Sequence, residues 1–494
     1  MSKEGQKELE FVGHILDNVH GFIPYTAAEK RIMDTPLFKR LQSIKQLSVV
    51  NWVFPGSEHT RFIHSLGVMH IADKMAISLG LTNDERRLLR LAGLLHDIGH
   101  YPLSHVCEAP YKKPMTLEEL PDKEFCRNIN EKKRDDIASV SIKAKTTFME
   151  KRGGLHHEAV GALIIQNNQE LRKIIVEECD NENAPDVIAD IIIGNVERPQ
   201  VDPLLVQIIH SELDADGIDY LMRDATFSGT SFGSFEIDQL IRCLDKVEQN
   251  GKRILCIKPK GIAAADQYLI NKFFSYSQVV FNKHIVISEW MAECVVDWMR
   301  QHHAVFPTGP DLEKWVKSKG TKKEYLNFTD NMFWSALDQI LNDQLSDLVP
   351  HYIKLFCEYL LHHNEPRFVE KSEVRFITDN SEDAQKLLGE ADILKEDSLL
   401  DQRITIMSSR AMTSQVPVEK FQEALKALKR DGAYDDASAD TSVPDPELSR
   451  LMECIAVKNS EEDIHLLCDD PLSLMRMMYA STLVMLRSYE FPQD

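Results

Sequence analysis

The residues best suited to metal chemistry gather in one short stretch, His96-Asp97-Ile98-Gly99-His100. It follows an apolar run, residues 88–95, whose composition predicts a buried helix. An ionised carboxylate buried beside an imidazole is costly unless a cation or a proton compensates its charge. Imidazole and carboxylate groups together suit a divalent metal ion. For His96 alone, a histidine favoured by the negative end of the helix explains the position equally well.

Two further segments have residues that could complete a metal site. His64 lies within residues 62–80, whose apolar spacing predicts an amphipathic helix. Farther along, residues 213–224 alternate carboxylates, Asp216 among them, with apolar residues at helical spacing. A solvated charged face is the usual meaning of such a run. A histidine, a His-Asp pair and a later aspartate on three helices would instead bring metal ligands together.

The ordered motifs of the chain resemble those of the HD-domain deoxynucleoside triphosphate triphosphohydrolases. That family includes the mammalian SAM-and-HD-domain enzyme and its bacterial relatives. The resemblance covers roughly residues 10–240, with weaker similarity to residue 290. A His-Asp pair alone would be a weak signal, whereas the ordered set is specific for the fold and indicates the reaction. The matching motifs are Asp34-Thr35-Pro36, Ile44-Lys45-Gln46-Leu47, Val53-Phe54-Pro55-Gly56, Arg61-Phe62, His64-Ser65-Leu66-Gly67-Val68, His96-Asp97, Ser104-His105, His157-Glu158, and Asp216 with Asp219-Tyr220 and Arg223-Asp224.

This resemblance implies a mainly α fold class, an all-helical HD-domain core with smaller α+β appendages. We expect a phosphohydrolase core over residues 1–245, a helical extension with a short strand over 246–365, and an α+β region over 366–494. The segment 11–23 is expected to be extended or turned. Apolar spacing predicts helices from about Thr26, over 37–50, and around 382–389, 417–430 and 471–488, and strands at 253–258, 373–378 and 403–407.

The core contains a polar insertion over residues 109–155. Between residues 111 and 152 it has 8 Lys and 3 Arg against 8 Asp and Glu, so it is locally basic in an acidic protein. It is either a solvated insertion or a lid or partner surface over an anionic ligand, and both interpretations stay open.

Composition limits the class of protein. The 494 residues have a formal net charge of −21, which favours solubility and argues against a constitutive nucleic-acid coat. The nine cysteines show no paired spacing, which indicates a reducing compartment and no cysteine-based zinc site. No apolar run approaches the length of a membrane span, and the first residues resemble neither a signal peptide nor an anchor. We therefore expect a cytoplasmic protein with no membrane partner.

The resemblance implies that one divalent metal ion is held by His64, His96, Asp97 and Asp216. Such ligands suit Fe, Mn, Co, Ni, Zn or Mg, and the sequence does not choose among them. A metal ion there would polarise a phosphoryl oxygen and lower the pKa of its bound water. In the family this water attacks the α-phosphorus, the 5′ oxygen leaves with the deoxynucleoside, and triphosphate departs intact.

The departing alkoxide needs a proton, so the reaction requires a general acid. His157 matches the family acid, and Glu108 matches the acidic residue that orients it. His100 and His105 match family histidines beside the phosphates. The insertion just before this motif leaves open whether the neighbouring His156 takes the place of His157.

Substrate contacts are also implied by the resemblance. Gln46 and Leu47 would line the deoxyribose, and the backbone of Leu47 would crowd a 2′ hydroxyl, so we expect dNTPs to be preferred over rNTPs. Lys272 stands where relatives have a phosphate-binding Arg, which weakens the triphosphate clamp. The expected substrate-binding residues are Arg61, Gln46, Leu47, Tyr220, Asp224 and Lys272.

Regulation is the last property that the resemblance implies. The mammalian relative is a tetramer switched on by a guanine nucleotide, and the matching effector positions here are Asp34, Gln42 and Lys283. Gln42 replaces an Arg whose fork binds O6 and N7 of guanine. Losing that charged contact costs on the order of 1.5–3 kcal/mol. We expect a homo-oligomer, dimer or tetramer, that depends on a dNTP effector but not specifically on GTP or dGTP.

The sequence thus predicts a metal-dependent dNTP triphosphohydrolase that releases deoxynucleoside and inorganic triphosphate. One alternative is another HD phosphohydrolase, such as a nucleotidase or a phosphodiesterase acting on a cyclic nucleotide or an alarmone. The other is a non-catalytic nucleotide sensor. Inorganic triphosphate is a product under the first hypothesis alone, and undetectable turnover would favour the sensor.

Overall fold

The computed structural model of the chain describes residues 8–112, 155–249, 251–302, 305–342, 349–364, 366–369, 374–378, 403–413, 446–460, 463–479 and 481–491. Two compact units comprise Met1–Met115, Gly153–Ser234 and Ile287–Glu365 in the first, and Thr116–Arg152, Phe235–Val286 and Pro366–Asp494 in the second. Nearly all of the insertion expected over 109–155 lies outside the described residues, as do the helices expected around 382–389 and 417–430. The three-part division expected from the sequence stays a prediction.

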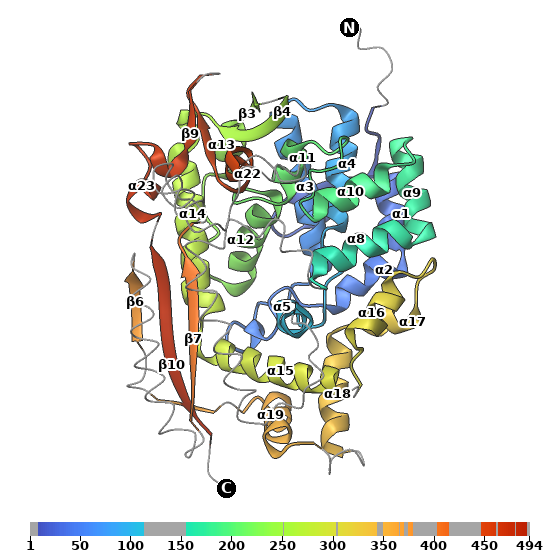
Figure 1. The fold of residues 1–494 in the computed structure, drawn as a ribbon, viewed down its shortest axis with the longest axis vertical. Coiled ribbons are helices and arrows are strands. Elements are labelled where there is room, and N and C mark those ends of the chain that lie inside the picture. The colour runs from blue at the N-terminus through green and yellow to red at the C-terminus, as the bar shows by residue number, and fades with distance from the viewer. Residues whose placement is uncertain are drawn as a thin grey trace, which may run out of the picture. The chain divides into compact units, whose positions relative to one another are not determined.

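The described part of the first unit is a hairpin followed by helices, which confirms the mainly α fold class (Figure 1). Its hairpin consists of β1 (Phe11–Asp17) and β2 (Gly21–Thr26). The helices are α1 (Ala27–Asp34), α2 (Pro36–Lys39), η1 (Arg40–Ser43), η2 (Val50–Trp52), α3 (Arg61–Ser78), α4 (Asn83–Leu95), α5 (His105–Glu108), η3 (Ala109–Lys112), α8 (His157–Asn167), α9 (Gln169–Cys179), α10 (Ala184–Ile192), α11 (Pro203–Ile209), α12 (Ala215–Ser228), most of α15 (Lys283–Gln301), α16 (Gly309–Val316), α17 (Lys323–Asn327), α18 (Asp330–Asn342) and α19 (His351–His362).

The hairpin leads directly into the first helix. Its strands pair antiparallel, with Asp17 opposite Gly21, whose φ of +70° lies in the left-handed region that glycine favours. Thr26 then caps α1: its hydroxyl accepts from the amide of Glu29, and the Glu29 carboxylate accepts from the amide of Thr26. The extended segment expected over 11–23 and the helix expected from about Thr26 are both confirmed.

Three helices that carry the expected metal ligands pack against one another. α3 and α4 lie side by side, and α12 packs on α3. The close approach of α3 and α4 depends on Gly93, because a Cβ there would lie 3.0 Å from the backbone of Met69. The helix α4 begins with a capping box in which Thr82 and Glu85 bind each other's amides. Helices expected over 62–80, 88–95 and 213–224 are therefore present.

One helix predicted beside the site is wrong. The helix expected over 37–50 ends at Ser43, and Ile44 is extended. The backbone then pairs with the segment before α3: the amide of Gln46 donates to the carbonyl of His59 (3.0 Å), and the amide of Arg61 donates to the carbonyl of Ile44 (3.0 Å). The apolar spacing correctly indicated that these residues are buried. However, hydrogen bonds to residues 59–61 take the place of the helical ones.

The second unit contains small sheets and helices. One sheet has the strand order β3 (Leu244–Gln249), β4 (Lys252–Ile257), β8 (Ala456–Lys458) and β9 (Ile464–Leu466). In the other, β10 (Thr482–Glu490) pairs with β5 (Arg367–Phe368), β6 (Val374–Thr378) and β7 (Arg403–Ala411). The described helices are α13 (Ile237–Arg242), η6 (Pro259–Gly261), α14 (Ile262–Ser275), η7 (Tyr276–Val280), α22 (Pro446–Glu453), η9 (Leu467–Asp469) and α23 (Met475–Met478). The strands expected at 253–258, 373–378 and 403–407 are confirmed.

The helix expected around 471–488 is also wrong. Among the described residues of this range α23 alone is helical, and β10 follows it with seven consecutive buried residues, 483–489. The apolar run 483–486 within this strand could come from a buried central strand as well as from a buried helix, so periodicity could not separate the two. Among the described residues, no helix is both long and apolar enough to cross a membrane.

We predict that Gly99→Ala destabilises the first unit. A Cβ at this position would lie 2.1 Å from the carbonyl oxygen of His157 and 2.3 Å from the amide nitrogen of Gly161, so α8 would have to shift. Overpacking of this kind costs about 1–3 kcal/mol, which a urea titration would detect as a lower free energy of unfolding.

Gly320→Ala is the matched control, because nothing lies within 4 Å of a Cβ placed there. It should change the free energy of unfolding by less than about 0.5 kcal/mol. If the two variants had the same stability, α8 would not be fixed against the His-Asp segment.

Candidate active site

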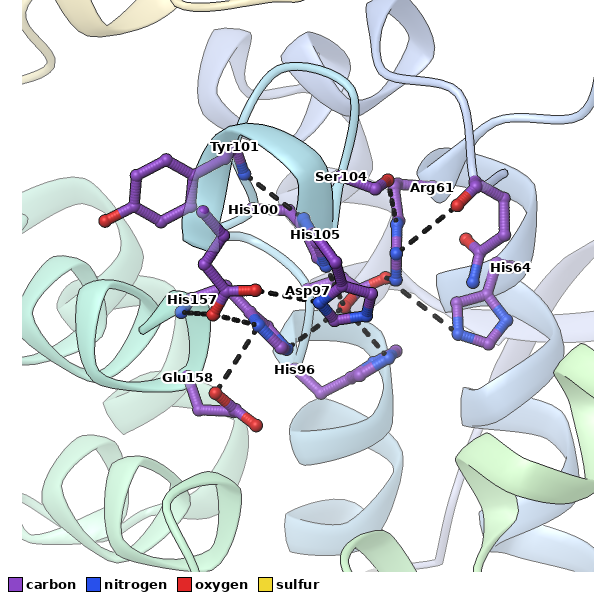
Figure 2. A network of polar contacts seen from close by, with 12 residues as sticks. Arg61, His64, His96, Asp97, His100, Tyr101, Ser104, His105, His157 and Glu158 are labelled. Atoms are coloured by element: carbon purple, nitrogen blue, oxygen red, sulfur yellow. Dashed lines mark hydrogen bonds and ion pairs between the residues drawn. The ribbon is translucent and has the colours of Figure 1, made fainter. Parts of the chain in front are cut away.

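The expected metal ligands come together in the first unit. His64 lies on α3, and His96 and Asp97 follow the end of α4 (Figure 2). Asp216 lies in the first turn of α12. Ligand atoms of His64, His96 and Asp97 lie within 4.8 Å of one another. Oδ1 of Asp216 lies 2.9 Å from Nε2 of His64 and 3.8 Å from Nε2 of His96. The side chain of Asp216 is 39% exposed while the other three are almost fully buried, so the cluster opens to solvent at Asp216.

His64 is held between two carboxylates. Its Nδ1 donates to Oδ2 of Asp219 at 2.7 Å, and its Nε2 donates to Asp216. Burial alone would lower the pKa of His64, but the hydrogen bonds and charges of these two aspartates raise it to about 10. The site thus favours positive charge at Nε2. A metal ion there would supply that charge, and Nδ1 would keep its proton and go on donating it in the hydrogen bond to Asp219.

Asp219 belongs to a buried network that sequence reasoning left without a role. Besides His64, its carboxylate binds Nε2 of His20 at 2.5 Å and the guanidinium of Arg223 at 2.8 and 3.0 Å. Arg223 also donates to Asp17 in the turn of the hairpin. Burial alone would raise the pKa of Asp219, but Arg223 and the two histidines hold it well below its usual range. The N-terminal hairpin is thereby fixed to the metal-ligand cluster.

This network fits only because residue 67 is glycine. A Cβ on Gly67 would lie 1.8 Å from Oδ1 of Asp219 and 2.5 Å from Nη2 of Arg223. Gly67 is one turn beyond His64, so any side chain there would push Asp219 away from the imidazole that it orients.

His96 presents a nitrogen suited to metal binding. Its Nδ1 donates to the carbonyl of Gly93 at 2.8 Å, which leaves the lone pair on Nε2. That Nε2 is buried and has no hydrogen-bond partner among the described residues. Asp97 lies beside it with its pKa well below the usual range: burial alone would raise it, but the charges of Arg61, His96 and neighbouring histidines lower it.

The residues present fit a divalent metal ion. They offer two imidazole nitrogens and two carboxylates from three rigid segments, with a buried Nε2 that nothing else in the described structure uses. Mixed nitrogen and oxygen ligands of this kind suit several divalent metals. The identity of the metal stays a prediction with the six candidates given above.

The expected acid lies next to this cluster. The amide of His157 and its Nδ1 both donate to Oε1 of Glu108, at 2.9 and 3.0 Å, and Nε2 lies 3.9 Å from Oδ1 of Asp97. Burial alone would lower the pKa of His157, but the charges of Glu158 and Glu108 raise it to about 9. His156 instead caps α8 through Nδ1. The geometry therefore favours His157 over His156.

Two more histidines complete this side of the site. His100 stacks on His157, with ring centroids 4.2 Å apart and planes 22° apart. Its Nδ1 accepts from the amide of Tyr101, and its buried Nε2 has no partner among the described residues. Burial and the charges of Arg61 and His157 keep its pKa well below the usual value. His105 donates from Nδ1 to Glu108 at 2.8 Å, and its side chain is 64% exposed.

The expected phosphate-binding Arg61 is buried over the same cluster. Its Nη1 donates to Oδ2 of Asp97 at 2.8 Å, its Nε to Oγ of Ser104 at 2.9 Å, and its Nη2 to the carbonyl of Gln46 at 3.5 Å. Oε1 of Gln46 is buried without a partner among the described residues, which suits a substrate contact. Leu47 follows, half-buried.

The expected sugar-binding residues lie on α12. Tyr220 is half-buried, and Asp224 is 7% exposed. Nε2 of His59 donates to Oδ1 of Asp224 at 2.8 Å, and the His59 ring packs on Phe227 with centroids 4.7 Å apart. His59 had no role in the sequence analysis.

The remaining expected residues make other contacts within their own units. Lys272 is on α14 in the second unit, with its Nζ 5.6 Å from the centre of the Tyr268 ring. Lys283 begins α15, also in the second unit, and its Nζ lies 4.6 Å from the centre of the Phe368 ring. Asp34 is exposed at the end of α1, where it pairs with Lys30 and Lys39, and Gln42 is exposed on η1. Their expected binding roles stay predictions.

Some of the missed residues had a signal in the sequence. His20 follows Asp17 by three residues and precedes a glycine, which is a turn pattern with two groups that can titrate. His59 precedes Arg61 by two residues in a segment already of interest. Neither position shows its partner in the sequence, because Asp219 and Asp224 are far away along the chain.

A comparison with known families bears on the part of the chain that holds this cluster. The family model described as HD domain matches residues 61–216, from the start of α3 to Asp216. The chain contains an HD domain. The HD domain agrees with the HD-domain core that the motifs led us to expect.

Several proteins are similar to the HD-domain chain. The protein MJ1154 of Methanocaldococcus jannaschii is 30% identical over 282 residues, which are 57% of this chain and 49% of the relative. The deoxynucleoside triphosphate triphosphohydrolase SAMHD1 of Homo sapiens is 44% identical over 104 residues, 20% of this chain and 17% of that protein. The chain thus spans half or less of the length of these relatives.

A solved structure shares the fold. A protein from Aquifex aeolicus has a TM-score of 0.62 at 21% identity, and the match covers 97% of this chain and 96% of that chain. At this level of identity the likeness concerns the arrangement of the backbone alone.

We predict that His96→Ala and Asp97→Ala abolish bound metal while the fold survives. Each variant removes one ligand, and even the loss of a residue that only supports a ligand weakens metal binding by roughly 10–100-fold. The measurement is metal content of the purified protein by mass spectrometry, with circular dichroism to follow the fold.

His156→Ala is the control, because His156 caps α8 and is not an expected ligand. This variant should keep its full metal content. If either ligand variant retained the metal content of the unaltered protein, the assignment of ligands would be wrong.

Proposed function

We propose that this HD-domain protein is a metal-dependent dNTP triphosphohydrolase that cleaves dNTPs to deoxynucleoside and inorganic triphosphate. The observation that carries the proposal is the position of His157, a proton donor held by Glu108 with its Nε2 3.9 Å from the metal-ligand carboxylate of Asp97. A metal site beside a poised acid suits attack on phosphorus with an alkoxide leaving group. The similarity to SAMHD1 over 104 residues supports this reaction.

Each residue would have one task. When bound, the metal ion would polarise a phosphoryl oxygen and activate its water. The guanidinium of Arg61 would neutralise phosphate oxygens as they bind. His100 would donate a hydrogen bond from Nε2 to a phosphate oxygen. Its Nδ1 accepts from the amide of Tyr101, so the ring proton is on Nε2. His157 would deliver its Nε2 proton to the 5′ oxygen as the ester bond breaks, and His105 would bind the released triphosphate.

The sugar would be recognised by groups from two segments. Asp224, held by His59, would accept the 3′ hydroxyl, and Tyr220 would stack on the ring. The unpartnered amide oxygen of Gln46 would accept another donor, and the backbone at Leu47 would leave no room for a 2′ hydroxyl.

Assembly and location are part of the same proposal. A homo-oligomer, dimer or tetramer, would use Asp34, Gln42 and Lys283 to bind a dNTP effector. The protein would act in the cytoplasm, because its nine cysteines show no paired spacing, as is typical of proteins from a reducing compartment.

We predict that His157→Ala lowers kcat by roughly 10²–10⁴-fold and leaves metal content unchanged, since a positioned acid contributes about that much. The variant loses the proton donor but none of the four ligands. Steady-state kinetics together with metal analysis would measure both quantities.

His156→Ala should retain most of the turnover, because His156 faces Glu158 and caps α8. If His156→Ala lowered kcat strongly and His157→Ala did not, His156 would be the acid.

The test of the function is product analysis with each dNTP and rNTP, alone and in pairs, in the presence of several divalent metals. We expect deoxynucleoside and inorganic triphosphate from dNTPs, and much slower turnover of rNTPs. Monophosphate or pyrophosphate as product would favour another HD phosphohydrolase. Absence of turnover under all conditions would favour a nucleotide sensor, and equal turnover of ATP and dATP would contradict the sugar contacts.

A further inference from the structure

Asp330 binds two backbone segments that carry expected active-site residues. Its Oδ1 accepts from the amide of Leu103 at 2.8 Å, and its Oδ2 accepts from the amide of Lys45 at 2.9 Å. Asp330 begins α18 and is 7% exposed. Leu103 belongs to the segment between His100 and His105, and Lys45 precedes Gln46. A single carboxylate thus links two segments far apart in the sequence.

The two segments are also joined to each other through Ser104. Its hydroxyl donates to the carbonyl of Lys45 at 2.7 Å and accepts from Nε of Arg61 at 2.9 Å. Asp330, Lys45, Ser104 and Leu103 therefore form a closed ring of hydrogen bonds and covalent backbone. Arg61 rests on that ring and reaches Asp97 with its other end.

The backbone held by Asp330 is strained. Leu103 has φ of 47° and Ser104 has φ of 54° with ψ of −127°, conformations that residues other than glycine rarely adopt. Such conformations persist only where surrounding contacts enforce them. Leu103 and Ser104 are 1% and 2% exposed, and the hydrogen bond from the amide of Leu103 to Asp330 is one of these contacts.

A second buried group holds the same segment from its other end. Arg40, 4% exposed, donates to the carbonyls of Ile98 and His100 at 3.1 and 2.7 Å. It also donates to the carbonyl of Phe328 at 2.6 Å, two residues before Asp330. Arg40 therefore binds two carbonyls of the 98–105 segment, and Asp330 binds one of its amides.

We propose that Asp330 is a positioning residue of the active site, which holds the 98–105 segment and, through Ser104, the guanidinium of Arg61. This proposal rests on the function proposed above only where its test measures kcat. Asp330 contacts neither metal ligands nor the expected substrate positions, so its effect is exerted through the backbone.

The folding energetics agree with a positioning role. Burial raises the pKa of Asp330 to about 6, although its two amide hydrogen bonds and the charges of Lys45 and Arg40 oppose this. The charged and titratable groups that face it are Lys45, Arg40 and Cys107. Because the folded pKa is above the unfolded one, ionised Asp330 lowers stability as the pH rises from about 4 to 6, and this penalty is complete above pH 6. Above pH 6 the ionised carboxylate of Asp330 therefore lowers the free energy of unfolding.

The test is Asp330→Asn, in which one carboxamide oxygen replaces two acceptors. At pH 8 we expect the amides of Leu103 and Lys45 to exchange hydrogen at least about tenfold faster, and kcat to fall by roughly 10- to 100-fold, with metal content unchanged and Tm equal or higher. Hydrogen exchange needs no turnover, so it tests the proposal even if the proposed reaction is wrong.

Asp297→Asn is the matched control. Asp297 is also a buried aspartate, 3% exposed, but it pairs with Arg300 on α15. This variant should lower Tm and leave kcat and exchange at Leu103 unchanged. The proposal would be overturned if Asp330→Asn failed to fold, lost more stability than the control, or kept both exchange at Leu103 and kcat within twofold of the unaltered protein.

Discussion

The candidate site depends on the hydrogen bond between Nδ1 of His64 and Asp219, which lies in a fully buried environment. Removing one partner of a buried charged pair costs roughly 3–5 kcal/mol, because the other charge is left uncompensated. The carboxylate of Asp219 is compensated on its remaining sides by Arg223 and His20. Nε2 of His64 is therefore aimed at Asp216 before any metal ion binds, and the ligand geometry is set by folding.

Charge balance extends outward from this bond through the first unit. Asp97 is matched by Arg61, and Glu108 by His157, so that each buried carboxylate has a cationic neighbour. The contact of Asp219 with α3 in turn requires glycine at position 67, because a Cβ there would lie 1.8 Å from Oδ1 of Asp219. A mobile loop would not hold such pairs at hydrogen-bond distance, whereas packed helices can. The chemistry that an HD domain supports follows from that rigidity.

The sequence predicted which histidines and aspartates lie close together better than it predicted the elements around them. Helical periodicity located α3, α4 and α12, and the motifs along them identified the clustered histidines and aspartates. Periodicity failed over 44–50, where pairing with residues 59–61 replaced a helix, and at β10, whose buried run resembles a helix. Partners such as Asp17, His20 and Asp330 were missed because their roles come from contacts across the fold, which no local pattern records.

The most direct test of the account is anomalous X-ray diffraction from crystals of the protein loaded with Mn²⁺. The account predicts one ion within about 2.0–2.3 Å of Nε2 of His64, Nε2 of His96, and a carboxylate oxygen from each of Asp97 and Asp216. Ligand atoms of His100, His105 and His157 also lie within 4.8 Å of one another, and they form the competing site. An ion bound by those three histidines, with the cluster around His64 empty, would contradict the account.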